Sequence, residues 1–282
     1  MATGIFDDLR QTASKLGSCD PLWLKHEQEP DFQIVEGGTT GPHIILLHGL
    51  LGALSNWDSL FPIIEKFSRP LGLHLPILTA HRSEVRVKAL TVFTEYLIRK
   101  RRLDPVILCG NSLGGHIALR LALASPELVD CLILSGASGL YEHSVDSLPV
   151  RPTPQYIREH MARVFHDRKF ITEEAVDEIH QILSKRMNVL NLINAARSAK
   201  KDNLLSVLNQ IKVPTLLLWG EDDEVTTMQV ANTFHKNIPN SKLVSIKNCG
   251  HAPMIEHPEW FAKEMEAFLK EHSIYYKNQS KQ

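Results

Sequence analysis

Four short apolar runs constrain the fold of this chain more than any other feature of its sequence. Each is the length of a β-strand rather than a helix, and each is bounded by Gly, Pro or Asp; they lie at residues 43–47, 105–109, 131–134 and 214–219. Nearly continuous apolar residues are typical of strands buried on both faces, as in a parallel sheet. Residues 72–78 and 242–246 are weaker strand candidates.

Helical periodicity fills much of the chain between these runs. Apolar residues recur at helix spacing in 112–124, where Ser125-Pro126 ends the helix, and again in 258–269. Strands that alternate with helices imply right-handed crossovers. The sequence therefore predicts an α/β fold with a doubly wound, mostly parallel sheet.

The alternation stops between residues 139 and 209, where the pattern is helical and no strand-like run occurs. Thr172 can cap a helix with two acidic residues in its first turn, and a second helix follows with Met187, Leu190 and Ile193 on one stripe. We expect residues 139–209 to form a helical cap, or lid, on a core made of residues 1–138 and 210–282. The first forty residues and the tail from Lys277 are expected to be peripheral.

The charge balance argues against a nucleic-acid partner or an anionic membrane surface. The 282 residues include 31 basic and 32 acidic side chains, for a formal net charge of −1, so no global field recruits such partners. The basic run from Arg99 to Arg102 ends a predicted helix, where cations suit the negative end of the helix dipole.

Cysteine usage and hydropathy point to a soluble, cytoplasmic protein. The four cysteines (Cys19, Cys109, Cys131 and Cys249) lack metal-ligand spacing, and two of them fall in predicted buried strands. Reduced thiols fit this pattern better than a disulfide framework. The N-terminus lacks the apolar region of a signal peptide, and no run reaches the ~18 apolar residues of a membrane span.

A nucleophile turn is predicted where the second apolar run meets the following helix. Gly110-Asn-Ser112-Leu-Gly114 matches Gly-x-Ser-x-Gly in the strand–turn–helix context that gives the motif its meaning. A sharp reversal projects the central side chain above the sheet, and small flanking residues are needed because strand and helix nearly touch. Ser112 is therefore the candidate nucleophile.

A serine hydroxyl needs a base, and His251 is the best placed of the fourteen histidines. It follows the candidate strand 242–246 and precedes the last helix, at the end of the sheet where ligand sites collect. A carboxylate after the strand 214–219 can hold its ring. Four consecutive acids, residues 221–224, offer one. The order Ser, Asp, His fits a triad, but spacing does not choose between Asp222 and Asp223.

Two backbone amides complete the predicted site. The loop after the strand 43–47, His48-Gly49-Leu50, can aim the Leu50 N–H at a substrate oxygen, and Leu113 N–H supplies the second donor. His48 is expected to support this loop by hydrogen bonding. No metal or organic cofactor is required by these residues.

Together these motifs strongly resemble the α/β-hydrolase superfamily over roughly residues 41–270. The matching stretches begin at His48 (with Trp57), Gly110, Trp219 and Gly250. In that family the acid usually stands three residues after the glycine that ends its strand, which implies Asp223 with Asp222 as the fallback. The resemblance also makes residues 139–209 the cap domain.

A narrower resemblance is to the carbon–carbon bond hydrolases that cleave aromatic meta-cleavage products. Arg186 could stand where those enzymes place a cap arginine for a substrate carboxylate, although an exposed helix charge is the simpler interpretation. Gly49-Leu-Leu-Gly-Ala replaces their glycine-rich oxyanion loop, and Ala252 replaces the usual Trp after the histidine. Residues 75–82 also lack their usual Asp-x-x-Gly-x-Gly-x-Ser.

We therefore expect a serine hydrolase that acts on a small-molecule substrate, with a small or medium carboxylic ester as the leading class. The alternatives are a carbon–carbon bond hydrolase, a lyase or thioesterase of the same fold, and a slow-turnover ligand sensor. Dehalogenases and epoxide hydrolases of this fold use an Asp nucleophile, which Ser112 argues against. The sequence sets no oligomeric state.

Overall fold

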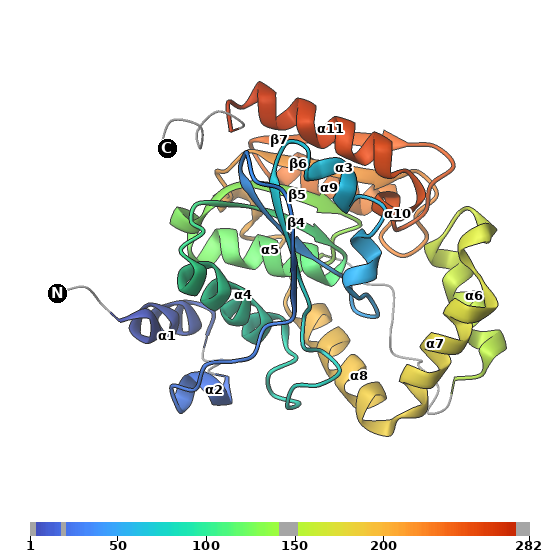
Figure 1. Cartoon of the computed structure of the whole chain (residues 1–282), viewed down its shortest axis with the longest axis horizontal. Coiled ribbons are helices and arrows are strands. Elements are labelled where there is room, and N and C mark those ends of the chain that lie inside the picture. The colour runs from blue at the N-terminus through green and yellow to red at the C-terminus, as the bar shows by residue number, and fades with distance from the viewer. Residues whose placement is uncertain (1–3, 18–20, 141–151, 275–282) are drawn as a thin grey trace.

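A computed structural model describes residues 4–17, 21–140 and 152–274 of the chain. Its centre is a seven-stranded sheet (Figure 1). The strand order is β1-β3-β2-β4-β5-β6-β7, and only β1 is antiparallel to its neighbour. The strands are β1 (Ile34–Glu36), β2 (His43–Leu47), β3 (Arg69–Leu73), β4 (Val106–Asn111), β5 (Val129–Ser135), β6 (Thr215–Gly220) and β7 (Ser241–Ile246). The predicted α/β fold with a mostly parallel sheet is confirmed.

The apolar runs are continuous because both faces of the sheet are buried. In β2, Ile45 and Leu47 belong to one hydrophobic core, whereas Ile44 and Leu46 belong to another on the opposite face. Successive side chains of a strand point to opposite faces, so an uninterrupted apolar run serves two cores at once.

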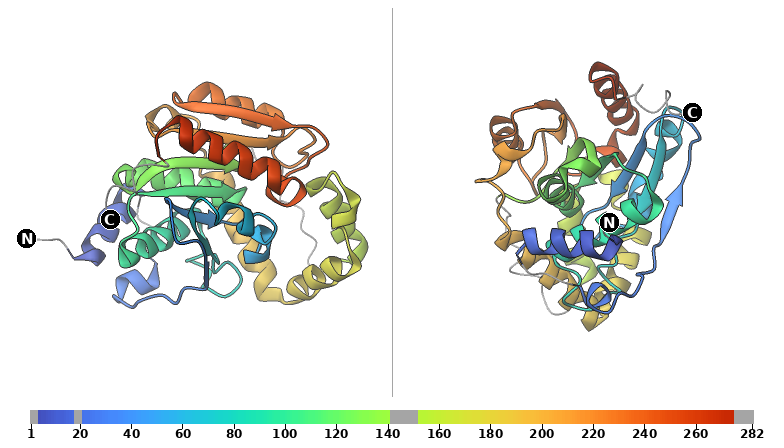
Figure 2. Two further views of the ribbon diagram at one scale, coloured as in Figure 1. Left: turned by 45° about the horizontal axis from the view of Figure 1, so that its top comes forward. Right: turned by 90° about the vertical axis from the view of Figure 1, so that its left-hand side faces the viewer.

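Helices cover the two faces in separate layers (Figure 2). One core includes side chains of α4 (Val87–Arg101), α5 (Leu113–Ala124) and α9 (Met228–Asn237). The other includes side chains of α3 (Phe61–Ile64), α10 (Pro253–Glu256) and α11 (Pro258–Glu271). The short 3₁₀ turns η1 (Leu54–Trp57) and η2 (Pro126–Leu128) connect elements of this layered core.

The N-terminal region is more integral to the fold than its sequence predicts, and describing it as peripheral is wrong. Helix α1 (Ile5–Lys15) packs on α4, where Leu9 and Ala13 are fully buried. A short helix, α2 (Leu22–Lys25), and the edge strand β1 follow. The apolar side of α1 packs on α4, a partner that is distant in the chain and that the local sequence does not reveal. The tail from Lys277 lies outside the described residues.

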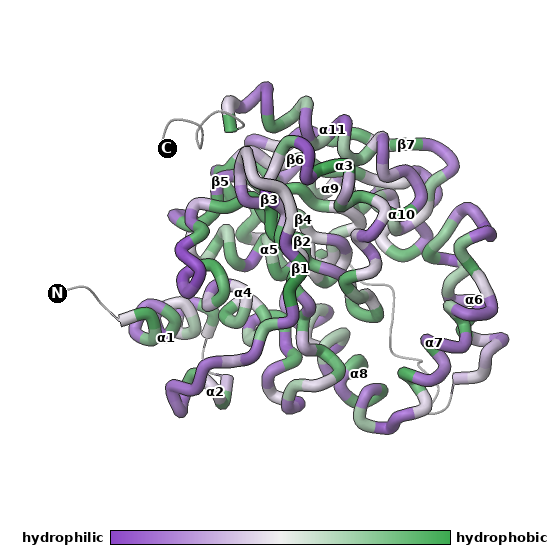
Figure 3. The backbone as a smooth tube through the Cα atoms, viewed as in Figure 1, coloured by the Kyte–Doolittle hydropathy of each residue, from purple (hydrophilic) through white to green (hydrophobic). Residues whose placement is uncertain are grey.

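The described part of the segment between β5 and β6 is helical and contains no strand. It comprises α6 (Pro154–Val164), η3 (Arg168–Phe170), α7 (Glu173–Ser184), α8 (Arg186–Lys201) and η4 (Leu208–Gln210). Helices α6–α8 extend to one side of the sheet (Figure 1), and their residues alternate between polar and apolar along the chain (Figure 3). Thr172 caps α7 as predicted, because its side chain accepts a hydrogen bond from Ala175 N at 3.2 Å. We call residues 139–209 the insertion.

The strand predicted at 72–78 is displaced along the chain. The observed strand, β3, begins at Arg69 and ends at Leu73, and its Pro70 lies in register with Ile44 of β2. Proline is unfavourable inside a sheet, which hides the true start of the strand. Residues 74–78, which were predicted to belong to the strand, follow its end, and Leu75 N donates to the ring of His48.

The basic run at the end of α4 is paired with carboxylates. Arg99 contacts Glu95, Asp8 and Glu127, and Lys100 and Arg101 contact Glu29 and Glu36. The helix ends at Arg101, with Arg102 in a left-handed cap conformation. The run is therefore a helix terminus that holds the N-terminal region against the core.

Within the described ranges, no helix combines the length and the apolar character that a membrane span needs. The three described cysteines, Cys109, Cys131 and Cys249, are free thiols and all are buried. Burial strongly raises the pKa of the Cys109 thiol, which keeps it protonated. Cys19 lies outside the described residues.

Candidate active site

Ser112 lies on a strained turn between β4 and α5. Its backbone has φ 54° and ψ −116°, an unfavourable combination for a residue with a side chain, and its side chain is partly exposed. Strain of this kind persists only where the surrounding structure enforces it, and it is concentrated at functional sites. The turn predicted from Gly-x-Ser-x-Gly is thus present in the structure.

Two glycines let the strand and the helix approach each other at this turn. A Cβ atom added to Gly110 would lie 2.5 Å from the backbone of Gly114, and one added to Gly114 would overlap the carbonyl oxygen of Leu47 in β2. Backbone atoms cannot move aside as a flexible side chain can. Both positions therefore require glycine for space, independently of backbone conformation.

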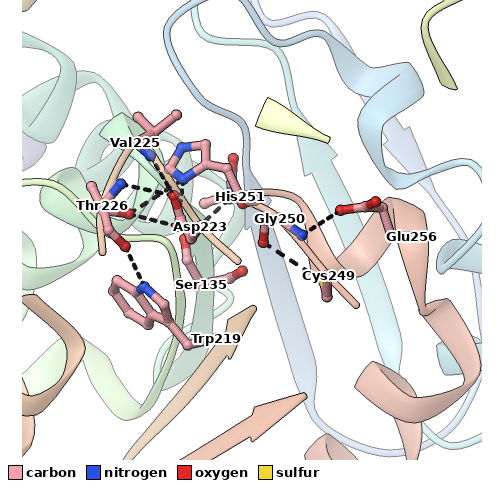
Figure 4. A network of polar contacts seen from close by, with 10 residues as sticks. Ser135, Trp219, Asp223, Val225, Thr226, Cys249, Gly250, His251 and Glu256 are labelled. Atoms are coloured by element: carbon pink, nitrogen blue, oxygen red, sulfur yellow. Dashed lines mark hydrogen bonds and ion pairs between the residues drawn. The ribbon is translucent and has the colours of Figure 1, made fainter. Parts of the chain in front are cut away.

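His251 and Asp223 meet at the carboxyl ends of β7 and β6. His251 Nδ1 lies 2.8 Å from Asp223 Oδ2, and both residues are buried, at 6% and 4% exposure (Figure 4). An ionised carboxylate only accepts hydrogen bonds, so the proton lies on Nδ1 of His251. The other ring nitrogen, Nε2, is left as an acceptor, which is the tautomer that a general base requires.

The Asp223 carboxylate is oriented by donors from its own loop. Oδ1 accepts from Val225 N at 2.7 Å and from Thr226 N at 2.8 Å, and Oδ2 accepts from Thr226 Oγ1 at 2.9 Å. The Trp219 indole, at the end of β6, donates to Thr226 O at 2.6 Å and so holds the loop that contains Asp223 and Thr226. These bonds fix the carboxylate in the direction of the histidine ring.

The other three acids of this turn have different partners. Asp222 Oδ2 accepts from Cys249 N and lies 3.3 Å from His166 Nδ1. Glu221 accepts from Ser245 Oγ, and Glu224 lies 3.8 Å from Arg163. Of the two aspartates that spacing leaves open, Asp223 is the one that contacts His251.

Asn111 connects the serine turn to the histidine loop, a role that the sequence analysis missed. Its buried Nδ2 donates to His251 O at 3.0 Å and to Ser135 O at 3.1 Å. A Cβ added to Gly136 would lie 2.7 Å from the His251 ring, so that glycine also packs against the histidine. A polar residue beside the nucleophile, at the end of a buried strand, was the available signal.

The predicted oxyanion loop lies against the serine turn. A Cβ added to Gly49 would lie 3.2 Å from Ser112 Cβ. Leu50 follows Gly49, and Leu113 is the first residue of α5, where the N–H has no partner within the helix. Donation by these two amides to a substrate stays a prediction.

His48 supports this loop from beneath, as expected. Its Nε2 accepts from Leu75 N at 2.9 Å, so Nδ1 carries the proton and donates to Gly49 O at 2.8 Å. Burial lowers the pKa of His48 to about 4, with the Gly49 hydrogen bond opposing that shift. The ring is therefore neutral at physiological pH and links β2, β3 and the loop.

Arg186 is the first residue of α8, and its side chain is exposed. The contacts within the described residues do not join it to Ser112, His251 or Asp223. Its role in binding a substrate carboxylate stays a prediction.

The α/β hydrolase family model matches residues 44–264, which include the serine turn, Asp223 and His251. This chain belongs to the α/β hydrolase family. An α/β hydrolase enzyme from the metagenome of lagoon sediments at Mar Chica, Morocco, is 32% identical, with a TM-score of 0.72 over 87% of this chain and 98% of that one.

Two curated relatives of this chain are named for different reactions. A pimeloyl-[acyl-carrier protein] methyl ester esterase of Nitrosomonas europaea is 28% identical over 80% of this chain and 95% of its own. A 2-hydroxy-6-oxononadienedioate/2-hydroxy-6-oxononatrienedioate hydrolase of Burkholderia vietnamiensis is 26% identical over 83% and 88%, respectively. The family thus sets the fold, while the substrate class differs between relatives.

Proposed function

We propose that this α/β hydrolase is a serine hydrolase, and most directly a carboxylesterase that acts on small to medium esters. The observation that carries the proposal is the buried His251–Asp223 hydrogen bond of 2.8 Å beside the strained Ser112 turn. The Asn111 amide supports it, because it ties the histidine loop to the residue next to Ser112. A relative named as a methyl ester esterase is consistent with ester chemistry.

In the proposed mechanism, Ser112 Oγ attacks the ester carbonyl while His251 Nε2 takes the hydroxyl proton. Asp223 stabilises the imidazolium that forms, and the Leu50 and Leu113 amides hold the tetrahedral oxyanion. Collapse breaks the carbon–oxygen bond of the ester, and His251 protonates the departing alkoxide. Water activated by the same histidine then attacks the acyl-enzyme, which releases the carboxylic acid and restores Ser112.

The insertion serves as the cap of this site in the proposal. Its helix α6 contacts the loop that carries His251 directly, since Val164 O at the end of α6 accepts from His251 N at 2.7 Å. After α8, Asp202 receives two hydrogen bonds from Arg120 of α5, at 2.6 and 2.7 Å. The insertion is therefore bonded both to the loop that carries His251 and to the helix that follows Ser112.

Carbon–carbon bond hydrolysis is the second candidate, because several relatives are named as hydrolases of oxo-dienedioates. It requires a positive group for the substrate carboxylate, for which Arg186 is the candidate. The exposed position of Arg186 and the departures in the oxyanion loop and after His251 favour the ester reaction.

The test is hydrolysis of p-nitrophenyl esters of increasing acyl length, alongside a 2-hydroxy-6-oxo-dienoate, with Ser112→Ala as the control. Ester turnover that disappears in Ser112→Ala supports the carboxylesterase. Turnover of the dienoate alone, reduced by Arg186→Ala, would replace it with the carbon–carbon bond hydrolase. A folded wild-type protein that consumes neither would contradict both.

A further inference from the structure

Glu256 uses both of its carboxylate oxygens to join two distant segments of the chain. It is the last residue of α10 and only 9% exposed. Its Oε1 accepts from Gly250 N at 2.7 Å, and its Oε2 accepts from Asp167 N at 2.8 Å. Figure 4 shows the carboxylate directed at the Gly250 amide, in the loop that carries His251.

The two segments that Glu256 joins belong to different parts of the proposed enzyme, the loop of the base and the cap. Gly250 immediately precedes His251, the proposed base. Asp167 lies in the insertion, between α6 and η3, and is 89 residues away from Glu256 in sequence. One buried carboxylate thus contacts the backbone of the loop that carries His251 and the backbone of the cap.

The backbones of these segments also touch each other beside Glu256. His251 N donates to Val164 O at 2.7 Å, and a Cβ added to Gly250 would overlap that same carbonyl oxygen. A displacement of the cap segment 164–167 would therefore pull on the amide of His251 itself. The half-exposed contact between His166 Nδ1 and Asp222 Oδ2, at 3.3 Å, adds a weaker tie nearby.

We propose that Glu256 is a positioning residue that couples the cap to His251, an inference that rests on the proposed function of that histidine. A carboxylate suits this role because each oxygen can accept a strong, charge-assisted hydrogen bond from a buried amide. Glutamine has the same shape but only one acceptor oxygen, so Glu256→Gln leaves one of the two amides without its bond.

Hydrogen exchange tests the bridge that Glu256 forms between the amides of Gly250 and Asp167, without any need for turnover. In Glu256→Gln, exchange of the amide of Gly250 or Asp167 is expected to become about tenfold faster, since a buried amide loses its charged acceptor. Exchange in α5 should stay as in wild type. The matched control is Glu259→Gln, which changes an exposed carboxylate three residues away. Unchanged exchange at both amides would overturn the inference.

Kinetics with the best p-nitrophenyl ester test whether the bridge positions the base. Glu256→Gln is expected to lower kcat about tenfold with KM changed less than about twofold, because a displaced base acts on the transition state and not on ground-state binding. Loss of thermal stability with an unchanged kcat would indicate a purely structural residue and overturn the inference.

A second variant pair approaches the bridge from the cap side and serves if Glu256→Gln fails to fold. Asp167 has φ −83°, which is close to the value that proline imposes, so Asp167→Pro removes the amide donor with little backbone change. Asp167→Ala is its control, because it removes the side chain and keeps the amide. A lower kcat in Asp167→Pro than in Asp167→Ala supports the inference, and equal values contradict it.

The two proposals fail in different ways. A wild-type protein that hydrolyses no ester contradicts the proposed function, and with it the coupling to a base, whatever the exchange data show. An active wild-type enzyme whose kcat and exchange rates survive both Glu256→Gln and Asp167→Pro contradicts the coupling alone.

Discussion

His251 Nδ1 and Asp223 Oδ2 are 2.8 Å apart, although 28 residues separate them in the sequence. Each residue stands in the loop that follows one of two neighbouring parallel strands, β7 and β6. The parallel arrangement brings these loops to the same edge of the sheet, and the contact leaves Nε2 as the ring nitrogen of His251 that Asp223 does not engage.

Asp223→Asn should lower kcat by about 10³–10⁴-fold, because an amide neither holds the same tautomer nor stabilises the imidazolium. Asp222→Asn is the matched control, since Asp222 contacts Cys249 and His166 rather than His251. Steady-state hydrolysis of the preferred p-nitrophenyl ester measures both variants. Equal losses in the two would show that Asp223 has no special role.

Gly114→Ala should prevent stable folding or cost about 3 kcal/mol or more, because the added methyl overlaps a backbone carbonyl that cannot move aside. Gly72→Ala is the comparison: its methyl would lie 3.1 Å from the flexible end of Leu54. Urea unfolding followed by circular dichroism gives both free energies. A Gly114→Ala protein as stable as Gly72→Ala would refute the close approach of α5 and β2.

His48 should make the protein less stable as the pH falls from about 6.5 to about 4. Its folded-state pKa of about 4 lies below the ordinary 6.5, so within this window the unfolded chain binds a proton that the folded chain excludes. Protonation of His48 is expected to lower the free energy of unfolding by roughly 3 kcal/mol over the whole window.

The measurement is the free energy of urea unfolding across that pH range for wild type and for His48→Asn, with the exposed His26→Asn as the control. The variant at position 48 should show a flatter dependence on pH than wild type. Parallel curves for all three proteins would contradict a buried, neutral His48.

Asp202→Asn should destabilise the protein at pH 7 by roughly 2 kcal/mol or more. Burial alone would raise the pKa of Asp202, but His116, whose Nε2 lies 3.3 Å from Asp202 Oδ2, and the hydrogen-bonded Arg120 outweigh it and lower the pKa to about 2. The stability from this lowered pKa is present above about pH 3.9 and is lost as the pH falls towards 2.

The difference between wild type and Asp202→Asn in urea unfolding should therefore shrink between pH 4 and pH 2. Asp31→Asn, at an exposed position in the segment that precedes β1, is the control and should have little effect. A small loss at pH 7 that does not change with pH would mean that the contacts of Asp202 with His116 and Arg120 do not anchor the insertion.

The sequence predicted the parts of this molecule whose residues carry a strong local pattern. Strands β2, β4, β5 and β6 are apolar on both faces, and the Ser112 turn depends on glycines at fixed spacing, so both were recognisable. Asp223 was distinguished from Asp222 only by family resemblance before the structure showed its contact with His251.

Other features depend on contacts between segments that are distant in the chain. Strand β3 was misplaced because Pro70 disguises its start, and α1 was missed because its burial depends on α4. Asn111 and Glu256 look like ordinary polar residues until the fold places their side chains against the loop of His251. No local pattern reports such long-range hydrogen bonds.

Labelling with a fluorophosphonate tests whether His251 and Asp223 activate Ser112. Such a probe reacts covalently with an activated serine, and mass spectrometry of the digested protein locates the adduct. We expect one adduct on Ser112, formed rapidly in wild type, at least about 10³-fold more slowly in His251→Ala, and absent in Ser112→Ala. Labelling of Ser112 at the same rate in wild type and His251→Ala, or labelling of a different residue, would contradict it.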